Sequence, residues 1–346
     1  MPLKRPLRTS GGSLDTAPFV LLDLRTDQGL NGLSYIFCYT MLVLKPLVQL
    51  VRNLEAIVVG ATVAPFKIES RLQNAFRLVG PQGLTGMALA GIDMAVWDIL
   101  AKGVGQPLCR LLGGPARSMP VYNSNGLGLI GAEKAAHEAA QLVGEGFDAI
   151  KIRLGYPDIA TDLSVVHAIR SEVGPNVRLM VDYNQSLSVQ EAIERGTRLD
   201  TEDILWMEEP VLATDLDGHA AVRAKIRTPV QTGENWWGPA DMQKAIAAGA
   251  SDFGMCDVIK IGGVTGWQRA AALARKAELP LSSHLFPEIS AHLLSTSRTG
   301  HWLEYVDWAN PFLQQPLAVT RGKAAPSEGP GSGLAWNEDA VEFYLV

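Results

Sequence analysis

Residues 178–208 read RLMVDYNQSLSVQEAIERGTRLDTEDILWME, and they contain the unit that repeats through most of the chain. A short apolar run ends in Asp182, a helical segment follows, and a second apolar run ends in Glu208. Strands that alternate with helices in this way are typical of a parallel sheet built from βα units. The same rhythm predicts strands at residues 121–125, 149–154, 178–184, 204–208, 230–235, 254–260, 281–286 and 302–306.

Eight such strands favour a closed α/β barrel. A doubly wound open sheet is the alternative, but no GxGxxG motif follows the first strand. Upstream, residues 17–37 alternate around two turn signals and predict a β-hairpin, and helices are expected near 41–58 and 84–103. We therefore expect an α+β domain at 1–115, a barrel at 116–310, and a tail at 311–346 that returns to the first domain.

Length, charge and cysteine use narrow the class of protein. The chain has 346 residues, enough for about two domains. Its 30 Lys and Arg against 36 Asp and Glu give a net charge of −6, which argues against nucleic acid or an anionic membrane as partner. The most apolar stretches, 39–50 and 87–101, are interrupted by charges, and the start MPLKRPLRTSGG lacks the apolar segment of a secretory signal. Three separated cysteines, Cys38, Cys109 and Cys256, favour a reducing, cytoplasmic setting.

Nearly every predicted barrel strand ends in a residue that can titrate or coordinate a metal. The carboxyl ends of parallel barrel strands meet at one mouth, where the active sites of such barrels lie. We therefore expect these side chains to form one site: Lys151, Arg153, Asp182, Glu208, Glu209, Glu234, Asp257, His284 and Glu304.

Three of these residues on successive strands are acidic only, namely Asp182, Glu208 and Glu234. A single such carboxylate would more simply belong to a surface or a salt bridge. Three in register predict a metal site, because buried carboxylates are costly unless they share a cation. Oxygen ligands without Cys or His favour Mg²⁺, with Mn²⁺ as a substitute.

Asp257 and His284 end the next two strands. Neighbouring strands lie about 4.8 Å apart, so the carboxylate can hold the imidazole in one tautomer and make His284 a general base. Three other histidines, His137, His167 and His219, fall in helical segments and are expected to be structural.

Lys151 and Arg153 are two residues apart and so project from the same face of their strand. They either balance the charge of the metal site or bind a substrate carboxylate, and Lys151 can also transfer a proton. Glu304 can donate a hydrogen bond to a developing enolate if burial keeps it protonated. Together these groups favour abstraction of a proton next to a carboxylate.

The strings KIRLGYP (151–157), MVDYNQS (180–186), MEEP (207–210), TGENWWGP (232–239), IKIGGVTGW (259–267), SSHLFPEISAHLL (282–294) and HWLE (301–304) resemble the enolase superfamily, and within it the mandelate racemase group. The resemblance implies a modified TIM barrel, (β/α)7β, under an N-terminal α+β capping domain, in a homo-oligomer. It also implies Asp182, Glu208 and Glu234 as Mg²⁺ ligands, Lys151 and Glu304 at the substrate carboxylate, His284 with Asp257 as base, and Asn184 and Ser124 in the substrate pocket.

One departure from the group concerns chemistry. Its racemases carry a second basic lysine two residues after the first, and Arg153 stands there in this chain. Deprotonating an arginine at pH 7 costs about 7.5 kcal/mol, so racemisation with two bases is disfavoured. One base suffices to remove an α-proton and return it to a leaving β-hydroxyl. The first hypothesis is thus a Mg²⁺-dependent dehydratase of an acid sugar, the second a racemase or epimerase of a 2-hydroxycarboxylate, and the third a non-catalytic relative that binds a carboxylate.

A second departure is that the chain starts where the lid loop of the group starts, so either its start is misassigned or its capping domain is trimmed. Residues 4–15, the expected lid loop, include Lys4, Arg5 and Arg8 and are cationic enough for an acid sugar or a diacid. Alternatively these charges are simply solvated. Four aromatic residues favour an aryl pocket unless they belong to the core: Phe37, Tyr39, Trp236 and Trp237.

Overall fold

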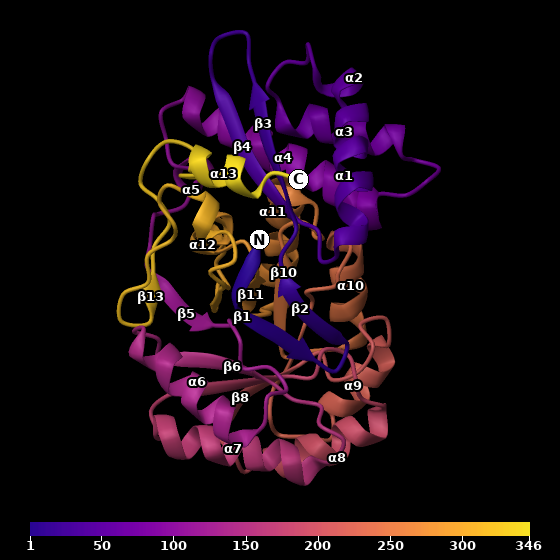
Figure 1. Cartoon of the computed structure of the whole chain (residues 1–346). Helices are drawn as coiled ribbons and strands as arrows, with labels where there is room; N and C mark the ends of the chain where they lie inside the picture. Colours follow the sequence, from indigo (N-terminus) through magenta and orange to yellow (C-terminus); the bar gives the residue numbers. More distant parts are fainter.

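The computed structural model describes residues 1–346 and places an α+β cap over a barrel (Figure 1). The cap strands are β1 Pro2–Thr9, β2 Gly12–Thr16, β3 Phe19–Arg25 and β4 Asn31–Phe37. The cap helices are α1 Met41–Asn53, α2 Glu55–Val58, α3 Pro65–Ala75, α4 Gly83–Gly103 and α5 Leu108–Leu111. The hairpin and both helices predicted for the cap are present, with the first helix interrupted at Leu54 between α1 and α2.

At the centre of the cap, helix α4 packs against the β3–β4 hairpin. Most of α4 is buried, and a Cβ at Gly32 would lie 2.0 Å from the carbonyl oxygen of Ala95, so glycine permits this close approach. By length and composition α4 could span a membrane, yet 83% of its most apolar window is buried inside the fold. Its apolar surface therefore forms the core of the cap.

All eight predicted barrel strands are present. They are β5 Met119–Asn123, β6 Ala149–Arg153, β7 Arg178–Asp182, β8 Ile204–Glu208, β9 Val230–Thr232, β10 Phe253–Asp257, β11 Leu281–His284 and β12 Leu303–Tyr305. They pair in parallel in the order β11-β10-β9-β8-β7-β6-β5-β12. The ring closes where Ser283 N–H donates to Trp302 O at 3.1 Å and His301 N–H donates to Leu281 O at 2.8 Å. The expected barrel is thus confirmed over the open sheet.

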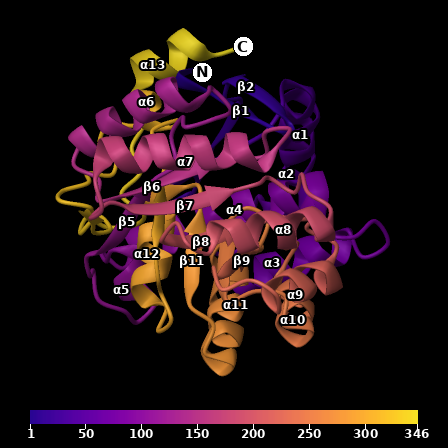
Figure 2. The same ribbon diagram turned by 90° about the horizontal axis from the view of Figure 1, so that it is seen from below.

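The helices that connect the strands surround them, as Figure 2 shows from below. They are α6 Ala132–Gly144, α7 Ile159–Val173, α8 Val189–Leu199, α9 Leu216–Arg223, α10 Pro239–Ala248, α11 Gly263–Ala277 and α12 Pro287–Thr296. Capping residues stabilise the N-terminal ends of two of these helices. Asp158 caps α7, and Ser188 with Glu191 forms a capping box at α8. The strand ends are held in register by their parallel pairing, with Arg153 opposite Asp182 and Asp182 opposite Glu208.

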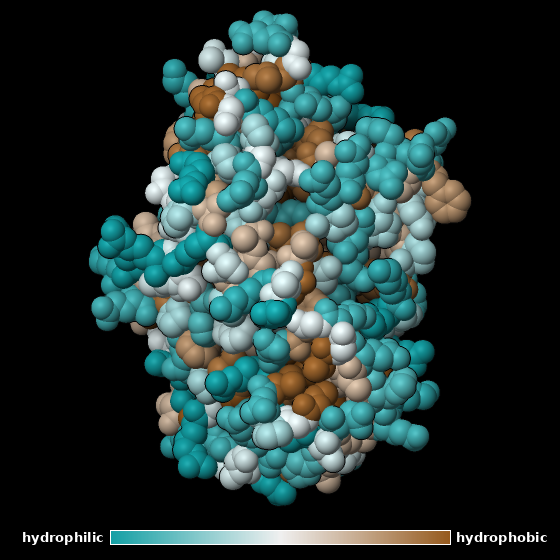
Figure 3. Space-filling model, turned by 90° about the vertical axis from the view of Figure 1, so that its left-hand side faces the viewer, coloured by the Kyte–Doolittle hydropathy of each residue, from teal (hydrophilic) through white to brown (hydrophobic).

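After the barrel come η1 Asn310–Phe312, β13 Lys323–Ala324 and α13 Glu338–Tyr344. β13 pairs with β5, and Ser332 donates from its N–H and its hydroxyl to Asp98 of α4. The tail thus contacts both the barrel and the cap. On the face in Figure 3 hydrophilic residues predominate, and the hydrophobic ones lie in separate patches.

The lid segment differs from the sequence prediction. Residues 4–15 were expected to be a loop, but they form most of the antiparallel hairpin β1–β2. Alternating burial of the side chains explains this strand, because Leu3 is buried while Pro2 and Lys4 on either side of it are exposed. The hairpin lies against the barrel mouth, where the N–H of Leu129 donates to Arg8 O at 2.9 Å.

Candidate active site

A cavity of about 310 Å³ lies between the barrel mouth and the lid hairpin. Charged and polar side chains of the barrel form its floor: Lys151, Arg153, Asp182, Asn184, Glu234, His284 and Glu304. Apolar and aromatic side chains form one wall: Leu7 and Leu14 of the lid, Phe37 and Tyr39 of the cap, and Leu285 and Trp308 of the barrel. Six of the nine strand-end residues predicted to meet thus line one cavity beneath the cap, while Glu208 and Asp257 contact them from behind and Glu209 bonds to Gly233 and Asn235 instead.

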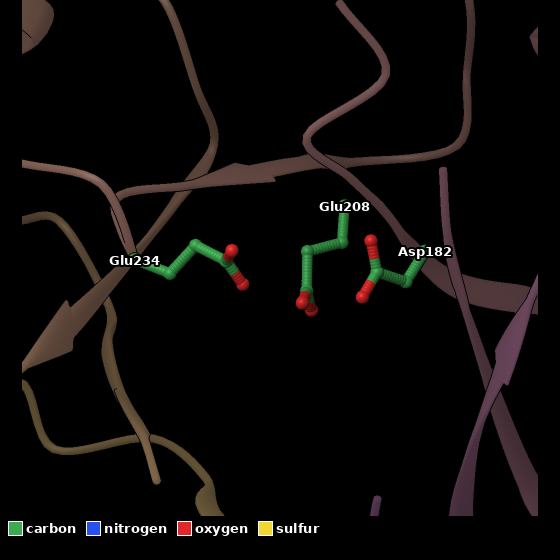
Figure 4. Close-up of side chains that lie close together, drawn as sticks. All are labelled: Asp182, Glu208 and Glu234. Carbon is green, nitrogen blue, oxygen red and sulfur yellow. The ribbon is translucent and has the colours of Figure 1, made fainter. Parts of the chain in front are cut away.

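Asp182, Glu208 and Glu234 bring their carboxylates together at one side of this floor (Figure 4). One ligand oxygen from each lies within 4.8 Å of the other two. Burial raises the pKa of Glu208 well above its ordinary value, so the folded chain alone opposes a charge there. The amide Oδ1 of Asn184 is buried nearby without a partner. An all-oxygen cluster with an unpaired acceptor fits Mg²⁺, which favours such ligands.

Lys151 is the cation that faces this cluster. Its Nζ donates to Glu208 and lies 3.4 Å from Asp182 Oδ2 and 2.9 Å from Glu304 Oε1. Burial alone would lower the pKa of Lys151, but the three surrounding carboxylates raise it above its ordinary value. Lys151 is therefore a fixed ammonium group, suited to binding an anionic substrate.

Glu304 differs from the expectation that burial keeps it protonated. Burial by itself would raise its pKa, yet Lys151 and His284 lower it below the ordinary value for a glutamic acid. Its Oε2 also accepts from the N–H of Leu285 at 2.7 Å. With these partners Glu304 is a carboxylate, because two cations and a backbone donor outweigh the cost of burial.

His284 and Asp257 form the expected pair across adjacent strands. They are register partners in β10 and β11, and His284 Nδ1 lies 2.8 Å from Asp257 Oδ2. If Nδ1 carries the proton and donates it to the carboxylate, Nε2 presents a lone pair. Nε2 lies 3.3 Å from Glu234 Oε2, on the side of the cavity. Burial would lower the pKa of His284, but Glu234, Glu304 and Asp257 raise it to about 9. At neutral pH the ring is therefore protonated on both nitrogens in the chain alone, and it would become a base once a bound cation offset the charge of Glu234.

Arg153 is held by the backbone next to β5. Its NH1 donates to Ser124 O at 2.7 Å and to Gly126 O at 3.2 Å, and its NH2 donates to Ser124 Oγ at 2.7 Å. Ser124, predicted to line the pocket, is not among the residues that line the cavity, and its hydroxyl accepts from Arg153 instead. Arg153 is thus fixed as a cation at the edge of the site.

The remaining predictions divide between wall and core. Asn184, Tyr39 and Phe37 line the cavity, whereas Trp236 is buried behind Gly233 and Trp237 lines a separate small pocket. The lid cations also point elsewhere: Lys4 lies 3.3 Å from Asp307, and Arg5 pairs with Glu138 and Glu145. Neither lines the cavity, so the lid is not the cationic cover expected from its composition.

Two polar residues near the site were not predicted from the sequence. Lys260 Nζ donates to Asn235 Oδ1 at 2.7 Å, and Asn235 Nδ2 donates to Glu209 at 2.7 Å and to Glu234 at 3.3 Å. A lysine in the apolar run VIKIGG, three residues after Asp257, was the available signal.

A cap over a barrel of eight strands, with three carboxylates and a histidine–aspartate pair at the mouth, defines the enolase class of enzymes. Residues 1–113 match the mandelate racemase / muconate lactonizing enzyme N-terminal domain, and residues 134–340 match the enolase C-terminal domain-like family. The chain belongs to the mandelate racemase/muconate lactonizing enzyme family of the enolase superfamily.

Relatives within this family differ in activity. The chain is 32% identical to D-galactarolactone cycloisomerase of Agrobacterium fabrum, over 99% of this chain and 96% of that protein. It is 32% identical to L-talarate/galactarate dehydratase of Salmonella typhimurium, over 79% of this chain and 69% of that protein. The crystal structure of an enolase from Bradyrhizobium complexed with magnesium and mandelic acid superposes with a TM-score of 0.95 at 47% identity, covering 100% of this chain and 95% of that one.

Proposed function

We propose that this protein is a Mg²⁺-dependent dehydratase that converts a 2,3-dihydroxycarboxylate, an acid sugar with one carboxylate, into a 2-keto acid. Asp182, Glu208 and Glu234 would hold the cation, whose positive charge would make the α-proton of a bound substrate more acidic. The convergence of these carboxylates and the burial of Asp182 and Glu208 support this assignment.

In the proposed reaction the protein's own residues bind the substrate and move one proton. Lys151 binds the substrate carboxylate, and Nε2 of His284 removes the α-proton while Asp257 holds Nδ1. The electrons of the broken C–H bond form the enolate, which then expels the β-hydroxyl. The same imidazolium returns its proton to this hydroxyl, which leaves as water, and the enol product tautomerises to the 2-keto acid. The Glu304 carboxylate, 2.9 Å from Lys151 Nζ, forms an ion pair that keeps the ammonium in place.

One observation carries the choice of dehydration: the site has one available base. The Arg153 guanidinium is hydrogen-bonded to the carbonyl groups of Ser124 and Gly126 and to the Ser124 hydroxyl. A guanidinium held in this way is a poor proton acceptor at neutral pH. Elimination needs a base on one face only, whereas racemisation needs proton exchange on both faces.

The cavity supports a substrate with one carboxylate. Lys151 and Arg153 are the lysine and arginine side chains that line it, and both lie on β6 beside the carboxylate cluster. The lid and cap residues that line the cavity are apolar, aromatic or hydroxyl-bearing and offer no cation to a second carboxylate: Leu7, Thr9, Ser13, Leu14, Phe37 and Tyr39. A diacid would therefore bury one charge unpaired, which is costly.

Racemisation of an aryl 2-hydroxycarboxylate is the second candidate. The aromatic wall of the cavity favours it, and so does the similarity to the Bradyrhizobium enolase complexed with mandelic acid. In that case Arg153, or another group on its face, would have to accept a proton.

Proton NMR in D₂O with Mg²⁺ separates the two candidates. The substrates to be compared are sugar acids with one carboxylate, tartrates, and both enantiomers of mandelate. We expect 2-keto acid formation from a monocarboxylate and none from tartrate. Deuterium incorporation into both mandelate enantiomers without loss of hydroxyl would instead establish racemisation. Substitution Arg153→Lys, which restores the second lysine, is then expected to increase racemisation and to leave dehydration no faster.

A further inference from the structure

A tyrosine of the cap contacts the proposed base pair. The hydroxyl of Tyr39 donates to Asp257 Oδ2 at 2.7 Å, and this oxygen also accepts from His284 Nδ1 at 2.8 Å. The other oxygen, Oδ1, accepts from the N–H groups of Ile259 at 2.7 Å and Lys260 at 3.2 Å. Four donors thus surround one buried carboxylate, and Tyr39 is the one that comes from outside the barrel.

Tyr39 is itself held from two sides. The Lys260 ammonium lies 4.5 Å from the centroid of its ring, and the Phe37 ring centroid lies 4.6 Å away. The backbone of Tyr39 has a φ of +58°, which a non-glycine residue adopts at a cost. Such conformations persist where surrounding contacts hold them, and they cluster at functional sites. The contacts from Lys260, Phe37 and Asp257 hold Tyr39 in this conformation.

We propose that Tyr39 is a positioning residue for the base: its hydroxyl fixes the carboxylate of Asp257, which in turn holds the His284 ring with Nε2 toward the substrate. The inference rests on the proposed function, in which His284 removes the α-proton. It also gives Tyr39 two tasks, since the residue lines the cavity while its hydroxyl donates to Asp257.

The chemistry of the contact fits this role. Burial, together with the charge of Asp257, raises the pKa of Tyr39 well above its ordinary value, so the phenol keeps its proton and remains a donor. A hydrogen bond from a neutral donor to a buried charge is among the stronger kinds in proteins. Without it, Oδ2 keeps His284 as its single donor, and the carboxylate has more freedom to rotate.

The substitution Tyr39→Phe removes the hydroxyl and keeps the ring. With a substrate identified in the D₂O assay, we expect kcat and the α-proton exchange rate to fall together by about tenfold, with KM changed less than about twofold. Tyr35→Phe is the matched control, because Tyr35 lies on the same cap segment and donates to a different buried carboxylate, Glu288, at 2.6 Å. It should leave the exchange rate unchanged. A higher KM with unchanged kcat in Tyr39→Phe would mean that the hydroxyl contacts substrate, and would overturn the proposal.

A double-mutant cycle tests whether Tyr39 acts through Asp257. In an Asp257→Ala background, Tyr39→Phe should have no further effect on exchange, because the partner of the hydroxyl is gone. If the two substitutions reduce the rate by independent factors, Tyr39 does not act through Asp257.

A spectroscopic readout needs no substrate. The Nδ1 proton of His284 should give a low-field proton NMR signal, assigned by its loss in His284→Asn. We expect Tyr39→Phe to shift this signal and Tyr35→Phe to leave it in place. An unshifted signal in Tyr39→Phe overturns the inference. If the wild-type protein turns over none of the substrates, the proposed function fails, while this signal still decides the role of Tyr39.

Discussion

At the scale of single residues, the site depends on how each charge is balanced. Lys151 faces three carboxylates, His284 faces Glu234 and Glu304, and Asp257 has four hydrogen-bond donors. The pKa of each group is therefore shifted by neighbouring charges and hydrogen-bond donors, and not by burial alone. This arrangement makes substitutions that preserve shape but change charge the most informative ones.

Substitution His284→Asn keeps size and polarity but removes the proposed base. We expect turnover and α-proton exchange to fall by 10²- to 10⁴-fold, in keeping with the usual contribution of a general base. His167→Asn is a suitable control, because His167 is an exposed helical residue paired with Glu202. Exchange measured by NMR in D₂O at the wild-type rate would exclude His284 as the base.

Substitution Glu208→Gln tests the proposed metal site. The amide keeps the shape but has no negative charge, so Mg²⁺ should bind at least about tenfold more weakly in calorimetry. Glu209→Gln is the matched control: its side chain is equally buried but hydrogen-bonds to Gly233 and Asn235 and lies outside the cluster. Equal losses of affinity in both variants would remove Glu208 from the ligand set.

At the scale of elements, the lid hairpin and the barrel strands show what the sequence can and cannot predict. The eight barrel strands were predictable because they are short apolar runs separated by helical segments, and nearly all of them carry a polar residue at or near their end. The position of Asp257 beside His284 followed from strand order alone. The lid hairpin was not predicted, because Pro6 and the paired glycines Gly11 and Gly12 obscure its alternation.

Contacts between distant elements were also beyond prediction. The Tyr39–Asp257 hydrogen bond joins residues 218 positions apart, and no local pattern encodes it. The lid cations illustrate the same limit. Their number was visible in the sequence, but their partners Asp307, Glu138 and Glu145 are set by tertiary packing.

Gly128 controls how closely the lid hairpin approaches the barrel. A Cβ there would lie 2.4 Å from the carbonyl oxygen of Arg8, on β1. Gly128→Ala should therefore displace β1, so that the amide of Leu129, which donates to that carbonyl, exchanges its hydrogen about tenfold faster. Gly144→Ala is the control, since a Cβ at this helix end meets open space. Unchanged exchange at Leu129 would show that the hairpin accommodates the extra carbon without moving.

At the scale of the whole molecule, the cap and the barrel are joined by buried polar contacts. Asp93 of α4 accepts from the N–H of Thr265 in α11 at 2.9 Å and from its hydroxyl at 2.5 Å. Trp97, one turn along α4, donates to the same hydroxyl at 2.8 Å. The tail adds a second connection through Ser332 and Asp98. The homo-oligomer expected from the family resemblance stays a prediction.

The Asp93 contact predicts a pH-dependent stability. Burial raises the pKa of Asp93 to about 7, above the value of about 3.9 for an unfolded aspartate. The folded protein therefore binds a proton that the unfolded chain releases, and this contribution to stability is lost as pH rises from about 4 to 7. Relative to wild type, Asp93→Asn should gain up to about 1.4 kcal/mol of unfolding free energy per pH unit in that range. A constant difference between the two proteins in denaturant titrations across these pH values would contradict this.

The fixed Arg153 has a consequence for substrate handedness. With His284 as the proposed proton acceptor, the site distinguishes mirror images at the α-carbon. Only the enantiomer whose α-hydrogen points toward β11 would react, while its mirror image would occupy the same carboxylate contacts and leave unchanged. A racemic preparation of a true substrate would then stop at half conversion, with the unreacted enantiomer left behind as a competitive inhibitor.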